Sequence, residues 1–195
     1  MNLLFEKKLS HGWFRAFDQK PTHTFTHVHQ THSVRVLDAM TPDLSTQEAD
    51  GIVARHRETL AIKTADCLPV AIEGTLGAAL LHAGWRGLAG GILTDKEVQK
   101  LQPREAFIGP CIRACCFEVT HEFAVNFPHT PVTKLSDGTL RFDLVAEARR
   151  QLKTQFDGIQ VSDSGVCTCC NTKYPSYRRD KTPQRIWNLY VPLAQ

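Results

Sequence analysis

Residues 60–85, LAIKTADCLPVAIEGTLGAALLHAGW, contain three short apolar runs separated by residues that favour turns. Apolar runs of this length, bounded by turns, predict strands at Leu60–Thr64, Val70–Ile72 and Gly77–Leu81. Strands that follow one another this closely in sequence tend to be neighbours in a sheet. The centre of the chain is therefore expected to be β-sheet, with Cys67 and His82 near strand ends.

The same kind of signal continues on both sides of this stretch. Further strands are predicted at Val34–Leu37, Gly51–Ala54 and Ala106–Ile108. The clearest helix covers Asp143–Phe156, because Asp143 is a typical N-cap and apolar residues recur at helical spacing until Gly158 stops the helix.

Two weaker helix signals begin at Thr120 and after Gly90, and the second ends before Pro103. The polar, histidine-rich segment His11–His32 is expected to be a loop. Strands gather in the middle of the chain instead of alternating with helices, which favours an α+β fold with a mixed sheet. No low-complexity linker divides the sequence, so one domain is predicted over residues 1–195.

Composition excludes several classes of protein. The chain has 195 residues, of which 42% are hydrophobic, and 23 Lys and Arg against 20 Asp and Glu give a net charge of +3. No run of like charges concentrates this excess, so nucleic acid is not a predicted partner. The first 17 residues resemble neither a signal peptide nor a membrane span, and a cytoplasmic protein without a membrane partner is expected.

Three residues of metal-ligand type stand beside predicted strands. Cys67 and His82 can meet if their strands are neighbours, and His32 would join them from the preceding loop. One thiolate and two imidazoles suit zinc, and three protein ligands leave a coordination position open for catalysis. Zinc also lowers the pKa of a bound water to about 7. The alternative is a hydrogen-bonded structural histidine and a buried cysteine, each of which is common.

The remaining cysteines form the groups Cys111-x-x-x-Cys115-Cys116 and Cys167-x-Cys169-Cys170. An odd total of seven cysteines with adjacent pairs does not fit a conventional disulfide framework, so reduced thiols are expected. Their spacing is compatible with a closed zinc site, although such a site requires the two groups to be adjacent in space. Structural thiols are the favoured interpretation. The pair His27-x-His29 could also bind a metal, but it is interpreted as two solvated loop histidines.

Two basic motifs are candidates for binding an anion. Arg86 lies in the glycine-rich turn His82–Gly91, whose backbone N–H groups could face a phosphate; a tight turn with Trp85 in the core is an equal alternative. Arg178 lies in Tyr174–Asp180, where aromatic rings and guanidinium groups could stack on a base and pair with an anion. An ordinary charged surface turn explains this motif equally well.

Taken together, these motifs resemble the purine nucleoside phosphorylase/laccase-domain family, also called the multicopper polyphenol oxidoreductase family, which includes the peptidoglycan editing factor. The matching stretches run in family order from about residue 11 to the C-terminus, and the two central ones are long and unusual. They are Gln30–Ser33, Ala49–Gly51, Thr64–Val70, His82–Gly87, Ile108–Ile112, Cys116–Val119, Cys167–Thr168 and Ser176–Asp180.

The resemblance implies a single laccase-domain-like catalytic domain, a sandwich of mixed β-sheets flanked by helices in an α/β/β/α arrangement. It also implies that His32, Cys67 and His82 are catalytic metal ligands, usually of zinc, and Asp66 is a candidate for orienting one of them. Family activities are phosphorolysis of adenosine, inosine and methylthioadenosine, and deamination of adenosine. A purine nucleoside and phosphate are therefore the expected small-molecule partners.

One departure from the family concerns phosphate. The segment Trp13–His29 is shorter than its family counterpart and has no Asn-Arg pair, whose arginine is thought to hold phosphate in the family. Arg15 matches an earlier family arginine. Arg15, Arg86 and Arg178 are therefore the candidate phosphate ligands, and weak phosphorolysis is the alternative.

Other activities use the same residues. Two histidines and a cysteine also bind copper in electron-transfer sites. Copper (Cu²⁺) is therefore an alternative metal, and phenol oxidation, the laccase activity, is an alternative reaction. The nine histidines of the chain are few for an oxidase with several coppers. A metal-free cysteine amidase acting on peptidoglycan precursors, with Cys67 as nucleophile and His82 or His32 as base, is a second alternative. A binding module without turnover is the third.

Overall fold

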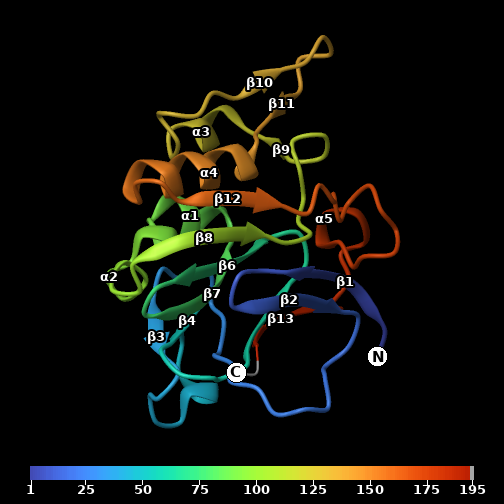
Figure 1. The fold of residues 1–195 in the computed structure, drawn as a ribbon. Helices are drawn as coiled ribbons and strands as arrows, with labels where there is room; N and C mark the ends of the chain where they lie inside the picture. The colour runs from blue at the N-terminus through green and yellow to red at the C-terminus, as the bar shows by residue number, and fades with distance from the viewer. Residues whose placement is uncertain (194–195) are drawn as a thin grey trace.

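A six-stranded mixed sheet forms the centre of the protein, as the computed structural model of residues 1–193 shows (Figure 1). Its inner pairs β8–β6, β6–β7 and β7–β4 are antiparallel, whereas the outer strands β12 and β3 pair in parallel with β8 and β4. In spatial order the strands are β12 (Gln160–Asp163), β8 (Pro103–Ile108), β6 (Leu68–Gly74), β7 (Gly77–Ala83), β4 (Gly51–Ala54) and β3 (Val36–Asp38).

A four-stranded antiparallel sheet packs beneath the first one. It joins the two ends of the chain, because the C-terminal strand β13 lies between β2 and β5. In spatial order its strands are β1 (Leu3–Lys8), β2 (Gly12–Phe17), β13 (Ile186–Pro192) and β5 (Leu60–Thr64). A small third sheet contains β10 (Thr133–Lys134), β11 (Leu140–Arg141) and β9 (Glu118–Val119).

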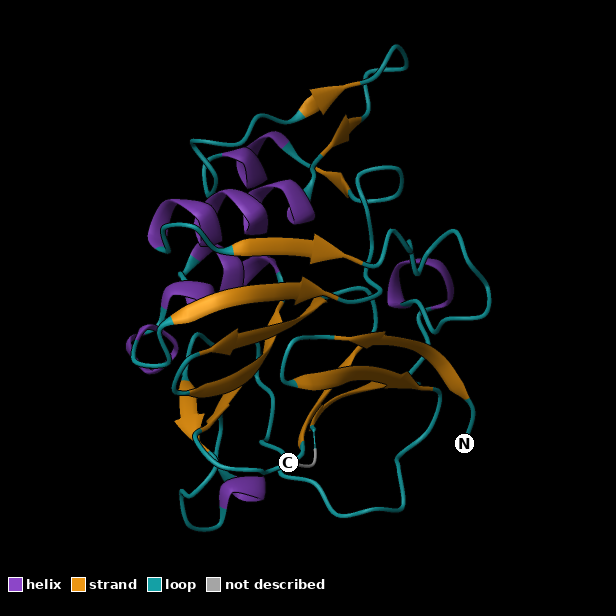
Figure 2. Cartoon of the chain, in the orientation of Figure 1, coloured by secondary structure: helices purple, strands orange, loops and turns teal. Residues whose placement is uncertain are grey.

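Helices cover the other face of the six-stranded sheet (Figure 2). The longest is α4, whose N-cap Asp143 accepts a hydrogen bond from the backbone N–H of Ala146 at 2.9 Å. Helix α4 spans Leu144–Gln155. The shorter helices are α1 (Trp85–Ala89), α2 (Lys96–Gln99), α3 (His121–Ala124) and α5 (Tyr177–Asp180). Single 3₁₀ turns cover Leu44–Thr46 and Ile92–Thr94.

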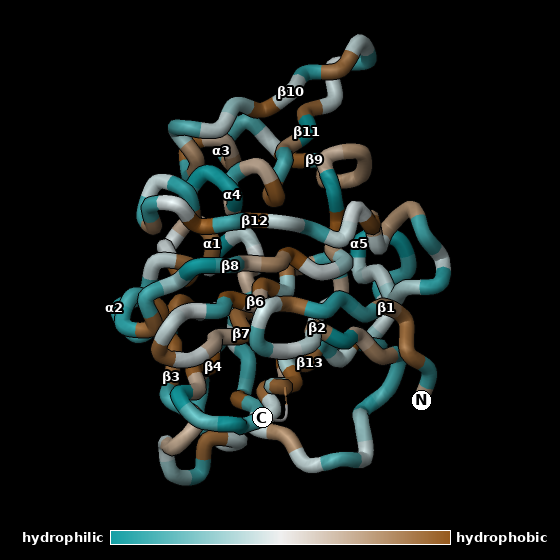
Figure 3. The backbone as a smooth tube through the Cα atoms, in the orientation of Figure 1, coloured by the Kyte–Doolittle hydropathy of each residue, from teal (hydrophilic) through white to brown (hydrophobic). Residues whose placement is uncertain are grey.

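Alternating residues of the central strands face two different cores. Val70 and Ile72 of β6 contact the helices, whereas Ala71 between them contacts the four-stranded sheet. This alternation follows from the period of two along a strand, and strands buried on both faces appear as nearly continuous apolar runs. Figure 3 shows hydrophobic residues concentrated on the inner strands β6 and β7.

The outer face of the four-stranded sheet is covered differently. Phe17, Ala61 and Leu189 form a small buried cluster there. Phe25, in the loop between β2 and β3, packs against this cluster together with Trp187. Within residues 1–193, this hydrophobic cover comes from a loop and from neighbouring strand residues, not from a helix. The layers are therefore helices, six-stranded sheet and four-stranded sheet.

The α+β fold with a mixed sheet predicted from the sequence is confirmed, and so is the grouping of strands before the long helix. The strands Gly51–Ala54 and Leu60–Thr64 have the predicted bounds, and the helix predicted at Asp143–Phe156 is α4. None of the helices among residues 1–193 is both long enough and apolar enough to cross a membrane.

Three local predictions were wrong. The expected loop His11–His32 contains strand β2, because Gly12–Phe17 pairs with β1 and β13 and buries Phe14 and Ala16 in the core between the two sheets. The helix expected from Thr120 ends at Ala124, before Phe127. The segment after Gly90 forms a 3₁₀ turn and the four-residue α2 instead of one helix.

Candidate metal and substrate site

His32, Cys67 and His82 converge at one end of the central sheet. Strands β6 and β7 pair with Leu68 opposite Ala83 and Pro69 opposite His82, so Cys67 lies just before one strand and His82 near the end of the other. His32 approaches from the loop before β3, and its ring centroid lies 4.7 Å from that of His82. One nitrogen or sulfur atom from each of the three side chains lies within 4.8 Å of the others. This spacing suits a shared ion.

Asp50, which is completely buried, holds two of these three residues, His82 by its side chain and His32 by its backbone. Its Oδ1 lies 2.7 Å from Nδ1 of His82 and accepts a hydrogen bond from the backbone N–H of His32 at 3.0 Å. Its Oδ2 accepts bonds from the backbone N–H groups of Thr31 and Ser33 and from the Ser33 hydroxyl. With Nδ1 protonated toward Asp50, His82 keeps the Nε2 lone pair for an ion.

The backbone around the three side chains is constrained. His32 has φ 61° and Asp66, the neighbour of Cys67, has φ 84°, both in the left-handed region. Residues other than glycine adopt this region at a cost, and such residues often cluster at functional sites. Gly84 provides the space for convergence, since a Cβ atom there would lie 3.1 Å from Cys67 Sγ and 3.2 Å from His32 Cδ2.

The electrostatics of the group favour an ionised thiol. Burial opposes ionisation of Cys67, but hydrogen bonds and charge interactions with His32 and His82 lower its pKa to about 6. Burial also opposes the charged form of His82, whereas Asp50 and Cys67 together raise its pKa to about 9. A thiolate is the form of cysteine that binds metals and attacks electrophiles.

A cavity of about 460 Å³ opens beside the three side chains. Its volume lies in the range of small-molecule sites, roughly 300–1,000 Å³. Lys63 and Arg185 give it positive charge, and Gln30 is fixed at its edge by hydrogen bonds to the backbone N–H (2.7 Å) and carbonyl (2.8 Å) of Lys63. The cavity is lined by Gln30, His32, Lys63, Thr64, Ala65, Cys67, His82, Tyr177 and Arg185.

A second cavity of about 320 Å³ shares Ala65, Cys67 and Tyr177 with the first. Trp85 and Phe117 give it an apolar side. The two cavities meet at Cys67. The second also holds Asp66, Arg178 and Lys181, and it is named the apolar compartment after its Trp85 and Phe117 side.

The three arginines predicted to bind phosphate lie in different places. Arg15 is on β2 beside Glu6 (3.4 Å) and Arg86 is exposed over the ring of Trp85, and neither lines the two cavities. Arg178 lines the second cavity, where its guanidinium group donates to the carbonyls of Cys116 (3.1 Å) and Glu118 (3.2 Å).

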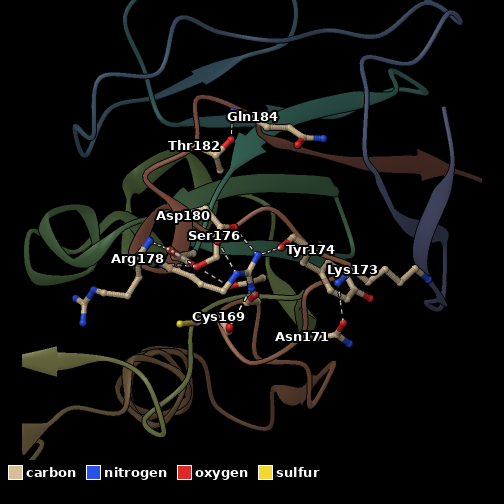
Figure 4. A network of polar contacts seen from close by, with 12 residues as sticks. Cys169, Asn171, Lys173, Tyr174, Ser176, Arg178, Asp180, Thr182 and Gln184 are labelled. Atoms are coloured by element: carbon tan, nitrogen blue, oxygen red, sulfur yellow. Dashed lines mark hydrogen bonds and ion pairs between the residues drawn. The ribbon is translucent and has the colours of Figure 1, made fainter.

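The Asp66 carboxylate makes its hydrogen bonds away from the three ligand-type side chains. It accepts from the hydroxyls of Thr168 (2.6 Å) and Ser176 (3.1 Å) and from the backbone N–H of Arg178 (2.7 Å). Figure 4 shows the polar network of this C-terminal segment, with Ser176 and Arg178 within it. Asp66 therefore holds this segment beside Cys67, and the carboxylate that contacts a histidine of the group is Asp50.

Sequence reasoning did not single out Asp50, Lys63 or Arg185 as site residues. Asp50 belongs to the motif Ala49–Gly51 that carried part of the family resemblance, and this was the one signal that could have identified it. Lys63 and Arg185 come from strand β5 and the segment before β13, and only the pairing of these two strands brings them together. His27 packs beside Trp187, and His29 is exposed.

Comparison with known proteins places these features in a family context. Residues 11–190 match the model of a family described as multi-copper polyphenol oxidoreductase laccase. A purine nucleoside phosphorylase of Aquifex aeolicus is 34% identical over 171 residues, which cover 84% of this chain and 81% of that protein. Purine nucleoside phosphorylase YfiH of Escherichia coli is 30% identical, covering 80% of this chain and 69% of the relative.

Solved structures share the fold. A Neisseria meningitidis protein of the DUF152 family superposes with a TM-score of 0.76 at 31% identity, covering 87% of this chain and 75% of the other. YlmD of Geobacillus stearothermophilus superposes with a TM-score of 0.75 at 24% identity, covering 87% and 74%. The arrangement of sheets described above is thus the fold of these proteins.

Proposed function

Because the chain belongs to the multi-copper polyphenol oxidoreductase laccase family, we propose that it is a zinc-dependent purine nucleoside phosphorylase that also deaminates adenosine. Relatives named purine nucleoside phosphorylase support the reaction class. The observation that carries the proposal is the convergence of His32, Cys67 and His82 at the wall of a cationic cavity. In this proposal residues 1–195 act as one catalytic domain in the cytoplasm.

The donor set fits zinc. Two imidazoles and one thiolate are typical zinc ligands, the thiol of Cys67 ionises readily, and Gly84 has no Cβ that would crowd Cys67 and His32. When bound, zinc supplies Lewis acidity and lowers the pKa of a coordinated water. Copper accepts the same donors, so the metal content of the purified protein decides between the two.

The cations of the larger cavity suit phosphate. In phosphorolysis a phosphate oxygen forms a bond to C1′ of the ribose while the bond from C1′ to the purine nitrogen breaks, and the base leaves with a proton. Lys63 and Arg185 would hold the phosphate by charge-assisted hydrogen bonds, and the fixed position of Gln30 beside Lys63 supports a defined orientation. Arg178 and Tyr177, at the apolar compartment, would orient the base.

The two activities differ in their co-substrate. In deamination a water oxygen adds to C6 of adenine and ammonia leaves, so phosphate is not consumed. Phosphorolysis, in contrast, requires phosphate and yields free base and ribose 1-phosphate.

The first experiment combines metal analysis with turnover. Wild type, Cys67→Ala and His29→Ala, an exposed histidine outside the cavity, would be assayed on adenosine with and without phosphate. Cys67→Ala should lose both zinc from this site and turnover, while His29→Ala keeps both. Undiminished turnover of Cys67→Ala would refute the proposal, and formation of adenine only with phosphate would separate phosphorolysis from deamination.

A cysteine hydrolase is the second candidate, and one observation favours it. Cys67, His82 and Asp50 stand in the order nucleophile, base and orienting carboxylate. Such an enzyme would attack an amide carbon with the Cys67 thiolate, release an amine and form a thioester that water then hydrolyses. Amide hydrolysis that survives removal of metal, with a trapped acyl group on Cys67, would support this function over the first.

A further inference from the structure

Four cysteines outside the site described above meet at the junction of two loops. Strands β8 and β12 are parallel neighbours, with Ile108 opposite Asp163, and both run toward α5 (Figure 1). The loops that follow them stay together, because the Cys111 carbonyl accepts from the N–H of Thr168 at 3.0 Å. Two cysteine groups that are more than 50 positions apart in sequence therefore become adjacent.

A tight turn in each loop directs its cysteines toward the other loop. In the first loop the N–H groups of Cys116 and Phe117 both donate to the Arg113 carbonyl at 2.9 Å. In the second loop the N–H of Asn171 donates to the Cys167 carbonyl at 3.0 Å. These turns place Cys115 and Cys116 on one side of a small space and Cys167 and Cys170 on the other.

The sulfur atoms are spaced for a shared ion. Cys170 Sγ lies 3.2 Å from Cys116 Sγ and 3.5 Å from Cys115 Sγ, and all four sulfurs lie within 4.8 Å of one another. Zinc bound by four thiolates at about 2.3 Å holds the sulfurs about 3.8 Å apart, so small shifts would complete the tetrahedron. We propose that Cys115, Cys116, Cys167 and Cys170 bind a structural zinc ion, separate from the site of His32, Cys67 and His82.

A disulfide explains the cluster less well. A disulfide joins two sulfurs about 2.05 Å apart, and Cys170 is close to two other sulfurs at the same time. All seven cysteines of the chain are free in the structure. Convergence of four thiols on one point is what a metal requires, whereas a pair of disulfides requires two separate contacts.

Two guanidinium groups beside the cluster suit the charge of such a site. Four thiolates around one zinc ion carry a net charge of −2. Arg179 donates to the carbonyls of Thr168 and Cys169, both at 2.9 Å, and Arg178 donates to the carbonyl of Cys116 at 3.1 Å. Both loops that carry the cysteines are thus held by cationic side chains, in the manner of the outer partners that support metal ligands elsewhere.

The position of the cluster shows what the ion would stabilise. Thr168, next to Cys167, donates its hydroxyl to Asp66, the neighbour of Cys67. Phe117, next to Cys116, and Arg178 line the apolar compartment. The ion would therefore stabilise the position of the cavity wall relative to the central sheet without taking part in the reaction. This role does not depend on which reaction the cavity supports.

Single and combined variants separate the two sites. Protein expressed in zinc-supplemented medium and passed over a weak chelating resin would be measured for metal content and for zinc X-ray absorption. We expect about two zinc ions per wild-type chain and about one in Cys67→Ser, the latter with four sulfurs at about 2.3 Å. Cys170→Ser should also keep about one, with nitrogen and sulfur neighbours, and the double variant should keep none. Cys169→Ser, the adjacent matched control, should keep both.

The proposal fails if Cys67→Ser contains no zinc, or if its absorption spectrum shows nitrogen neighbours. Loss of the second ion in Cys169→Ser but not in Cys170→Ser would also overturn it. If Cys170→Ser does not fold, cobalt added to Cys67→Ser provides an independent test. Strong thiolate-to-cobalt absorption would support the four-cysteine site, and absence of this absorption would refute it. Absence of zinc from the histidine site alone would overturn the proposed function and leave this one intact.

Discussion

The two clusters of potential metal ligands differ in donors and in surroundings. His32, Cys67 and His82 offer three donors at the wall of an open cavity, whereas the four cysteines offer a complete set of four at a loop junction. Three protein donors leave a position for water or substrate, and four thiolates leave none. Both clusters contain exposed side chains, so the number of donors and the adjoining cavity, more than the presence of cysteine, distinguish a reactive site from a structural one.

The largest effect should come from the carboxylate that supports the histidine site. In Asp50→Asn the side chain loses its negative charge, so it is a weaker acceptor for Nδ1 of His82. Its hydrogen bonds with the backbone N–H groups of Thr31, His32 and Ser33 are weakened as well. Loss of such a partner costs roughly 10–100-fold in metal affinity. Competition with a chromophoric chelator would measure this loss.

Asp66→Asn is the matched control, because Asp66 is also a buried carboxylate with three hydrogen bonds but contacts none of the three donors. It should leave zinc affinity at the histidine site within a few-fold of wild type. Equal losses in the two variants would show that Asp50 has no special role.

Proton release on zinc binding should differ between the clusters. At pH 7.5 Cys67, with its pKa lowered to about 6, is already ionised, and His82, with its pKa raised to about 9, must lose about one proton. In the other cluster burial and neighbouring thiols raise the pKa of Cys115 to about 11 and the pKa of Cys116 further, so at least two protons must leave.

Each released proton weakens zinc binding about tenfold per unit of falling pH, so the four-cysteine cluster should weaken more steeply on acidification. Calorimetric titration in buffers of different ionisation enthalpy, using Cys67→Ser and Cys170→Ser, counts the protons at each site. Equal counts would contradict the assigned ionisation of the thiols.

A smaller effect is expected at the phosphate side of the cavity. Lys63→Ala should raise KM for phosphate several-fold to about tenfold while kcat changes little, because an ionic contact to the bound anion is lost. Arg86→Ala, which removes a guanidinium group outside both cavities, should leave both constants unchanged. A higher KM for phosphate in Arg86→Ala, with no change in Lys63→Ala, would instead support phosphate binding at the glycine-rich turn.

The smallest effect should be on stability near the four-cysteine cluster. Asp163 accepts a hydrogen bond from Arg113 at 2.7 Å and also pairs with Arg149, and these partners lower its pKa although burial opposes ionisation. This stabilisation is present above the pKa of an unfolded aspartate and is lost as pH falls through the lower folded value. Asp163→Asn should lower stability by about 1 kcal/mol at pH 7 and by less near pH 3, measured by urea unfolding. A constant difference across pH would contradict this assignment.

The elements with strong local signals could be predicted without knowledge of the fold. Strands Gly51–Ala54 and Leu60–Thr64 are bounded by turns, and α4 begins at a capping aspartate, so short-range physics fixed their limits. The resemblance to a family, carried by contiguous motifs, pointed to His32, Cys67 and His82 before their distances were known.

No local pattern predicts which distant residues meet, because these contacts depend on how the strands pair. The strand Gly12–Phe17 lacks a strong local signal and is formed by pairing with β1 and β13. Asp50 reaches His82, and Lys63 approaches Arg185, through contacts between strands. The four cysteines converge because β8 and β12 are neighbours. A local pattern fixes the conformation of a segment, but long-range pairing depends on the burial of the whole chain, and this sets the chemistry of the clusters.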